Sequence, residues 1–171
     1  MFQDEARFGR VSRPRACWVP RPIRPRISGQ MVREFVYVFG AVSPEDGAHD
    51  SLVLPYADTE AMSRFLKEVS RRHPGDYILM FMDQAGWHRS AELKVPPNTE
   101  LAYLPPHSPE LNPQEQVWDE LREKHFGNCF FRSIGAVADR LVEGLRRMEA
   151  SPDALKSLTQ RDWMKNEYGV L

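Results

Sequence analysis

The feature that most constrains the fold is a run of six apolar residues, 77–82 (YILMFM), that ends abruptly at Asp83. A continuous apolar run of this length is typical of a strand that is buried on both faces. Such a strand needs helices on each side of its sheet. We therefore expect an α/β fold with this strand at the centre of the sheet and a carboxylate at the strand's end.

The rest of the chain supplies further strands and helices to complete this sheet. A first strand holds Asp4, a hairpin joins 34–42 to 51–54 through a turn at 43–47, and 101–104 is another short strand. Apolar stripes and helix-end signals predict helices at 58–72, 112–126 and 133–148, with a short helix at 88–93. This order of elements predicts a mixed α/β sheet with antiparallel and parallel parts, flanked by helices.

The length favours one domain with a small appendage. We assign residues 1–150 to the domain and 151–171 to a partly helical tail, in which Trp163 and Tyr168 are candidate packing anchors. The chain has no run of 18 apolar residues and no signal-peptide pattern at its start. The first of these absences predicts that no segment spans a membrane. The two cysteines lack CxxC spacing, which argues against a disulfide framework and a Cys-rich zinc site, so we expect a cytoplasmic protein.

Arginine is concentrated in one segment. Residues 6–33 contain eight arginines and no Lys, Asp or Glu, although the net charge of the chain is −1. Four prolines in the same segment exclude a helix and indicate a long extended loop. A solvated loop is the ordinary explanation of such a charge run. Guanidinium groups also suit bidentate contacts to phosphate, so DNA is a candidate partner. The arginines are Arg7, Arg10, Arg13, Arg15, Arg21, Arg24, Arg26 and Arg33.

Three acidic residues are candidates for a metal site, namely Asp4 in the first strand, Asp83 after the apolar strand and Glu115 at a helix start. Carboxylate oxygens suit hard cations such as Mg²⁺ or Mn²⁺, and two such ions can catalyse phosphodiester chemistry. Each residue also has an ordinary alternative. Asp4 could be a charge at a frayed terminus, Asp83 a turn residue, and Glu115 half of a capping box with Asn112. Glu5 adjoins Asp4, but alternate strand side chains point to opposite faces, so only one of the two can enter a shared site.

The histidines need the same comparison. His88 lies five residues after Asp83 and is a candidate contact for a substrate phosphate or for the site residues. We interpret His49, His73 and His125 as structural or surface residues. No pair of histidines has the i, i+4 spacing of a helical zinc site.

Four blocks of sequence resemble a known family. They are 3–9 (QDEARFG), 18–25 (WVPRPIRP), 82–88 (MDQAGWH) and 103–118 (YLPPHSPELNPQEQVW). In this order they resemble the catalytic domain of DDE-type transposases of the mariner-like bacterial insertion-sequence group. The resemblance covers about residues 1–148. Gln84 departs from the family pattern, which usually has Asn at that position.

The resemblance implies an RNase H-like fold and a metal-dependent endonuclease and DNA strand transferase that acts in DNA transposition. It places the three catalytic, metal-binding carboxylates on Asp4, Asp83 and Glu115, with two Mg²⁺ or Mn²⁺ ions as cofactors. Gln84 and Asn112 are expected to support them. The arginine loop and His88 are expected to bind the DNA of the element ends and the target.

The resemblance also bears on partners. Family members usually carry helix-turn-helix modules before the first aspartate, whereas three residues precede Asp4 here. We therefore expect a separate N-terminal DNA-binding module and a homodimer. An alternative function is a catalytically silent, truncated transposase that binds DNA or a partner as a regulator. A junction resolvase on the same fold fits less well, because of the block at 103–118.

Overall fold

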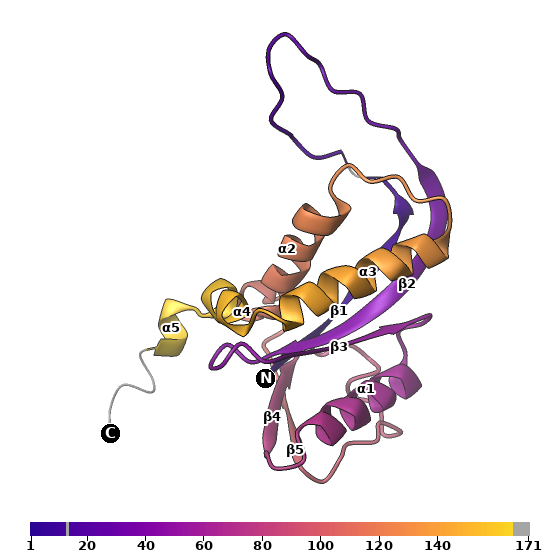
Figure 1. Ribbon diagram of the computed structural model, residues 1–171. Helices are drawn as coiled ribbons and strands as arrows, with labels where there is room; N and C mark the ends of the chain where they lie inside the picture. Colours follow the sequence, from indigo (N-terminus) through magenta and orange to yellow (C-terminus); the bar gives the residue numbers. More distant parts are fainter. Residues whose placement is uncertain (13, 166–171) are drawn as a thin grey trace.

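The computed structural model describes residues 1–12 and 14–165 (Figure 1). Its strands are β1 (Phe2–Val11), β2 (Met31–Val42), β3 (His49–Leu54), β4 (Ile78–Met82) and β5 (Thr99–Tyr103). Its helices are α1 (Thr59–Arg72), the short 3₁₀ helix η1 (Pro109–Leu111), α2 (Gln114–Phe126), α3 (Ile134–Glu149), α4 (Pro152–Thr159) and α5 (Asp162–Lys165). None of the described helices is both long enough and apolar enough to cross a membrane.

The strands form one mixed sheet in the order β3-β2-β1-β4-β5. β2 pairs antiparallel with β3, as the hairpin pattern predicted, and also antiparallel with β1, while β1–β4 and β4–β5 are parallel pairs. The central strand is therefore β1. The prediction that the apolar run forms the centre of the sheet is wrong, because β4 lies one position from the edge.

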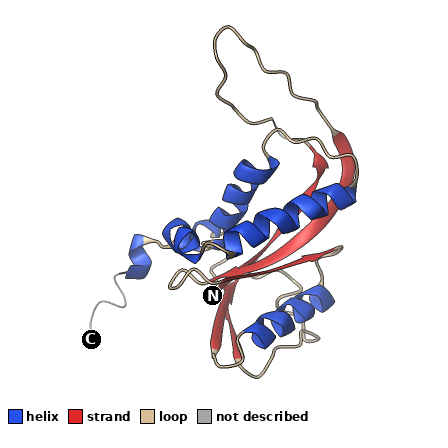
Figure 2. Cartoon of the chain, viewed as in Figure 1, coloured by secondary structure: helices blue, strands red, loops and turns tan. Residues whose placement is uncertain are grey.

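Helices cover both faces of the sheet, as Figure 2 shows. α1 packs on one face over Phe39, Met80 and Met82, and α2, α3 and α4 pack on the other over Ala6, Phe8 and Val38. This second layer covers β1 to β3 and leaves part of β4 open, so Leu79 is 42% exposed. The apolar run is thus buried on one face only, because the helix layer on the other face stops before it reaches β4.

Local signals at the helix ends agree with the structure. Asp58 accepts a hydrogen bond from the Ala61 backbone N–H at 2.8 Å, and Ser133 accepts one from Ala136 at 3.1 Å, so both side chains cap their helices. The expected short helix at 88–93 is wrong, since these residues form turns. α4 extends the core beyond residue 150, because Leu155 is only 2% exposed. Trp163 is 47% exposed, and Tyr168 lies outside the described residues.

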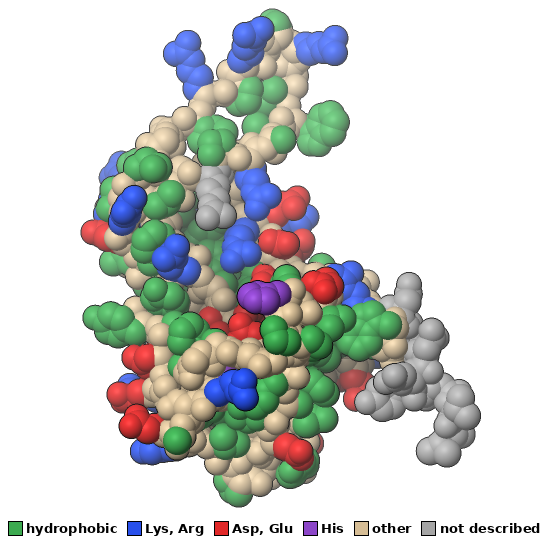
Figure 3. Space-filling model, turned by 180° about the vertical axis from the view of Figure 1, so that it is seen from behind, with side chains coloured by type: hydrophobic (Ala, Val, Ile, Leu, Met, Phe, Trp, Pro, Cys, Tyr) green, Lys and Arg blue, Asp and Glu red, His purple; other side chains and the backbone are tan. Residues whose placement is uncertain are grey.

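The segment between β1 and β2 projects from the body as an extended loop, as predicted (Figure 1). Its base is anchored by the Gln30 side chain, which bonds to the backbone N–H and C=O of Phe131. Asn128 holds the other side through two hydrogen bonds to the backbone of Arg15. Beyond these anchors the loop is exposed, and Figure 3 shows its basic side chains standing clear of the body.

Candidate active site

Asp4 lies near the start of the central strand and is held by a tryptophan. Its Oδ2 accepts a hydrogen bond of 2.9 Å from Nε1 of Trp118 on α2. Trp118 is fully buried and packs against Gly40, the β2 residue paired with Asp4. A Cβ at Gly40 would come within 2.5 Å of the indole, so only glycine lets the ring reach Asp4. The sequence reasoning missed both Gly40 and Trp118.

The surroundings of Asp4 favour its neutral form. Burial first, and then the negative charges of Glu115 and Glu5, raise the pKa of Asp4 to about 8, while the hydrogen bond from Trp118 opposes the rise. A frayed-terminus charge would keep an ordinary pKa, so that alternative does not describe Asp4. A carboxylate with a strongly raised pKa beside two other acidic groups is a feature of functional sites.

Asp83 follows β4 directly and comes level with Asp4. β1 and β4 are parallel with Phe2 opposite Phe81, so the residues two positions further on, Asp4 and Asp83, lie at the same height of the sheet. Asp83 Oδ1 accepts hydrogen bonds from the Ala85 backbone N–H at 2.9 Å and from His88 Nδ1 at 2.8 Å. The first bond is the expected turn role. The hydrogen bond from His88 lowers the pKa of Asp83 despite partial burial, and the Ala85 bond contributes to the same effect.

His88 links Asp83 to Glu5. Its Nε2 lies 2.8 Å from Glu5 Oε1, and the ring is only 1% exposed. Burial lowers the pKa of His88, but the hydrogen bonds to Asp83 and Glu5 outweigh it and raise the pKa to about 10, so the ring is a cation that donates to both carboxylates. The predicted phosphate contact does not fit this position, because both ring nitrogens are already occupied inside the protein.

Glu5 is the acidic residue that the sequence reasoning left out. Strand alternation does turn Glu5 away from Asp4, which bonds to α2 on the opposite face. Glu5 nevertheless belongs to the site, because His88 connects it to Asp83 and Trp87 Nε1 donates a second hydrogen bond to it at 3.2 Å. Only the fold of the loop after β4 could reveal this connection.

Glu115 lies in the first turn of α2, three residues after Asn112, whose side chain ties the start of the helix to β1. Asn112 accepts a hydrogen bond from the Gln114 backbone N–H at 3.1 Å and donates one to the Gln3 carbonyl at 2.8 Å. The backbone N–H of Asn112 bonds to Pro109, so Glu115 does not form the alternative capping box. Among the described residues, the Glu115 carboxylate makes no hydrogen bond.

The environment of Glu115 couples it to the other carboxylates. Burial raises its pKa against the pull of Arg122, and the charges of Asp119 and Asp83 add to the rise. Glu115 therefore interacts electrostatically with both Asp4 and Asp83. Gln84, the other predicted supporting residue, donates to the Leu104 carbonyl at 3.0 Å and so braces the loop after β4 against the end of β5.

The three carboxylates supply oxygen ligands of the type that Mg²⁺ or Mn²⁺ prefers. Within residues 1–12 and 14–165, however, no three His, Cys, Asp or Glu side chains are grouped so that they could hold a metal ion together. Asp4 is turned to Trp118 and Asp83 to His88. The residue types fit a hard cation, because a cation would favour the charged form of Asp4, whose pKa is raised by burial and then by the charges of Glu115 and Glu5.

The arginines of 6–33 divide into different environments. Arg10 is 17% exposed and bonds to Glu34 and to the Phe131 carbonyl, so it stabilises the fold and is not available for the predicted DNA contact. Arg7 is exposed and lies over the Phe35 ring at 4.3 Å. The remaining predicted DNA contacts that the structure describes are exposed, namely Arg15, Arg21, Arg24 and Arg26, and Arg13 lies outside the described residues.

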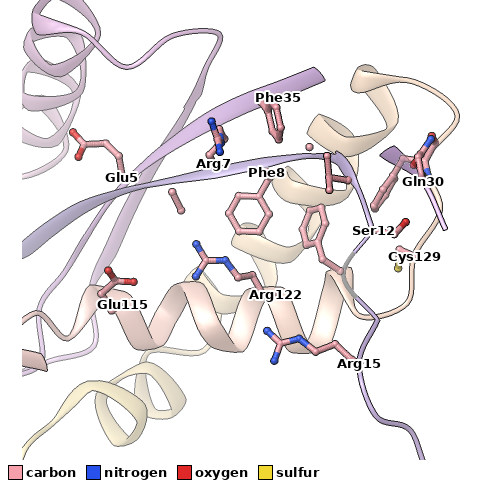
Figure 4. A pocket seen from close by; sticks show the side chains of 15 residues that line it. Glu5, Arg7, Phe8, Ser12, Arg15, Gln30, Phe35, Glu115, Arg122 and Cys129 are labelled. Atoms are coloured by element: carbon pink, nitrogen blue, oxygen red, sulfur yellow. Dashed lines mark hydrogen bonds between the residues drawn. The ribbon is translucent and has the colours of Figure 1, made fainter. Parts of the chain in front are cut away.

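A further arginine outside the predicted segment faces the site. Arg122 lies seven residues after Glu115 on α2, which is two helical turns and therefore the same face. Its guanidinium is 5.6 Å from the centre of the Phe8 ring. Figure 4 shows Arg122 between β1 and α2, on the side of Glu115. The helical spacing was a signal that the sequence reasoning could have used.

Comparison with known proteins identifies related chains. An uncharacterised protein of Sinorhizobium fredii (strain NBRC 101917 / NGR234), y4pE/y4sA, is 40% identical over 130 residues, which are 75% of this chain and 96% of that protein. The Mos1 strand transfer complex matches with a TM-score of 0.62 and 14% identity over 94% of this chain. The Mos1 mariner paired end complex with Mn matches with a TM-score of 0.61 and 13% identity, also over 94%.

The structural matches concern the fold. They confirm the predicted RNase H-like mixed sheet flanked by helices. This chain covers only 54% of the chain in the strand transfer complex and 55% in the complex with Mn. The family profile described as DDE superfamily endonuclease matches residues 1–138. Because this match extends over most of its length, the chain belongs to the DDE superfamily of endonucleases, as the resemblance predicted.

Proposed function

We propose that the chain is a transposase catalytic domain that cleaves DNA and transfers strands in a metal-dependent reaction at the ends of an insertion sequence. The observation that carries this proposal is the placement of three carboxylates: Asp4 and Asp83 lie at the same height of the sheet, and Glu115 lies in the first turn of α2, the helix whose Trp118 bonds to Asp4. Burial and the neighbouring negative charges raise the pKa of Asp4 and of Glu115, and a bound cation would favour their charged forms. The family membership of the chain supports the same reading.

In this proposal each carboxylate has a defined role. Asp4, Asp83 and Glu115 would hold two Mg²⁺ or Mn²⁺ ions, and ions held there would supply Lewis-acid chemistry for cleavage and transfer of a phosphodiester. Cation binding would favour the charged form of Asp4, and its proton would pass to solvent. His88 holds Asp83 in one orientation and is itself held by Glu5. Two of the similar Mos1 paired end complexes are complexes with Mn and with Mg, which supports a divalent cation as cofactor.

DNA is the proposed substrate and the arginine loop its main electrostatic contact. Arg21, Arg24 and Arg26 are exposed and lie on the projecting part of the loop, where they can follow a phosphate backbone (Figure 3). Contacts of this kind position a duplex but do not read its sequence. Binding by the isolated chain should therefore depend strongly on salt and little on sequence.

The proposed activity is tested with a supercoiled plasmid in Mg²⁺ or Mn²⁺. We expect nicking by the wild type, none in EDTA, and none by Asp83→Ala. Isothermal titration with Mn²⁺ should show binding that Asp83→Ala greatly weakens. Arg140→Ala, on the exposed part of α3 away from the site, is a matched control that should nick like the wild type. Absence of nicking and of Mn²⁺ binding in the presence of DNA would refute the proposal.

We also propose a homodimer. The projecting loop exposes Trp18 completely, and Ile23 on the same loop is 58% exposed. Large apolar side chains in this position favour a partner surface. Light scattering coupled to gel filtration should give twice the mass of the chain, and Trp18→Ser should shift it to the monomer mass. A monomer at all concentrations would contradict this part of the proposal.

A second candidate function is a catalytically silent regulator that binds DNA or a partner. It is favoured by one observation, namely that no three ligand side chains are grouped around one point among the described residues. The same assay separates the two functions. A regulator binds DNA without nicking it in either metal, and its DNA affinity is indifferent to Asp83→Ala.

A further inference from the structure

A groove runs along the open edge of the central strand. β4 pairs with β1 only at Phe2, and Asn112 bonds to the next carbonyl, that of Gln3. From there to Val11, no described strand pairs with this edge of β1. The groove has a volume of about 400 Å³ and lies between this edge and α2 (Figure 4). Such an edge normally needs a partner or a cover.

Charge varies along the groove. Glu5 and Glu115 line one end, and Figure 4 shows Arg7 and Arg122 next along it and Arg15 further on. Neither Arg7 nor Arg15 makes an ion pair with a described residue, in contrast to Arg10. Arg122 has only a 3.4 Å contact to Asp119. The groove therefore offers two cationic groups without an ion pair among the described residues, Arg7 and Arg15, and a third, Arg122, whose ion pair with Asp119 is long and which lies close to Glu115.

Aromatic rings form the apolar part of the same groove. Phe126 and Phe131 are partly buried, lie with their ring centres 5.5 Å apart, and line the groove together with Phe35. The guanidinium of Arg7 lies over Phe35, and that of Arg122 over Phe8. In this position the guanidinium of Arg7 makes no hydrogen bond with a described residue, and that of Arg122 makes only the 3.4 Å contact to Asp119, so both have N–H groups left for a phosphate.

We propose that this groove binds one unpaired nucleotide of a DNA strand, next to the phosphate that reacts at the three carboxylates. Its phosphate contacts Arg122 and Arg7, and its base packs against Phe126 and Phe131. A space of about 400 Å³ is of the size of a small-molecule site and cannot hold a duplex. Arginine beside aromatic rings is the usual combination for unpaired nucleotides.

The proposal rests on the proposed function, because it places this nucleotide beside the reacting phosphate. An extended peptide could also pair with an open strand edge. The three arginines favour a polyanion instead. The two occupants make different predictions for DNA with unpaired ends.

The test measures binding in EDTA, so that no cleavage occurs. Fluorescence anisotropy compares a blunt duplex with the same duplex carrying three unpaired nucleotides at its 3′ or 5′ end. We expect one overhang to bind about 5- to 100-fold more tightly than the blunt end, the range for stacking of one base on aromatic side chains. 2-Aminopurine in that overhang should change its fluorescence on binding. The preferred polarity identifies the strand that enters the groove.

Two variants locate the effect. Arg122→Gln should remove most of the overhang preference. Arg140→Gln is its matched control, because Arg140 also faces a carboxylate three residues away, at 3.5 Å, but lies on α3 outside the groove. Both variants lose one charge, so their affinities for the blunt duplex should fall alike. Arg15→Gln provides a second groove variant whose side chain makes no hydrogen bond in the described structure.

Equal affinity for blunt and unpaired ends would overturn the proposal, and so would an equal effect of Arg122→Gln and Arg140→Gln on the preference. An extended peptide as the natural occupant predicts the first of these results. Nicking of plasmid without any overhang preference would refute nucleotide binding in the groove and leave the proposed function intact. An overhang preference without nicking would support nucleotide binding in the groove and refute the proposed function.

Discussion

Replacing Asp4 by Asn should stabilise the metal-free protein, although Asp4 is a proposed catalytic residue. The pKa of Asp4 is raised to about 8 in the folded protein, whereas an unfolded aspartate has a pKa of about 3.9. Between these values the unfolded chain releases a proton that the folded chain keeps. Stability is therefore lost as the pH rises from about 4 to about 8, at up to about 1.4 kcal/mol per pH unit.

Asn removes this titration and keeps a side-chain oxygen that can accept the Trp118 hydrogen bond. The advantage of Asp4→Asn over the wild type should consequently grow with pH. Because solvent screens part of the interactions of Asp4, we expect a gain of about 2–4 kcal/mol between pH 5 and pH 8.

Urea unfolding in EDTA at pH 5, 6, 7 and 8 measures this difference. Asp83→Asn is the control of opposite sign, since the lowered pKa of Asp83 means that its charge stabilises the fold at neutral pH. Mg²⁺ should stabilise the wild type more at pH 8 than at pH 6 and should have little effect on Asp4→Asn. Parallel curves of stability against pH for Asp4→Asn and the wild type would show that Asp4 titrates normally and would refute the reasoning.

Three further predictions concern other parts of the site and the loop. Glu115→Gln should leave the melting temperature nearly unchanged, because the Glu115 carboxylate makes no hydrogen bond in the described structure. Plasmid nicking should nevertheless collapse, because a neutral amide is a poor ligand for Mg²⁺. A variant that unfolds, or one that stays fully active, would contradict the proposed role of Glu115. His88→Ala should lower the free energy of unfolding by about 3–5 kcal/mol in urea titrations at pH 7, since it leaves the buried carboxylate of Glu5, 8% exposed, without its cation. The contribution of His88 should fade as the pH rises towards its folded pKa of about 10, and a pH-independent loss would argue against the ion pair. Alanine at three exposed loop positions should flatten the slope of log K against log salt by about three units in anisotropy titrations, whereas an unchanged slope would mean that the loop does not contact phosphates. These positions are Arg21, Arg24 and Arg26.

Much of the local structure could be predicted because it depends on neighbouring residues. A run rich in β-branched and aromatic residues, followed by a turn, identified the β2–β3 hairpin. Helical periodicity identified α1, α2 and α3, and polar residues before α1 and α3 marked where they begin. The one helix that was wrongly predicted, at 88–93, lies where a turn instead carries His88 into the interior. That turn depends on a partner 83 residues away, Glu5, and no local pattern contains it.

The sequence by itself determined the family and named the candidate site residues. The blocks around Asp4, Asp83 and Glu115 pointed to an endonuclease family, and the family match agrees. Only the tertiary structure decided how these residues are arranged. Strand order is set by hydrogen bonds between distant segments, so the structure alone revealed that β1 is central and that Asp83 lies level with Asp4. The structure alone also separated Arg10, which is bound inside the fold, from Arg7 and Arg122, which line the groove. The reason is the same, because the periodicity of a sequence shows which face of an element a side chain occupies but not which distant residue it meets there.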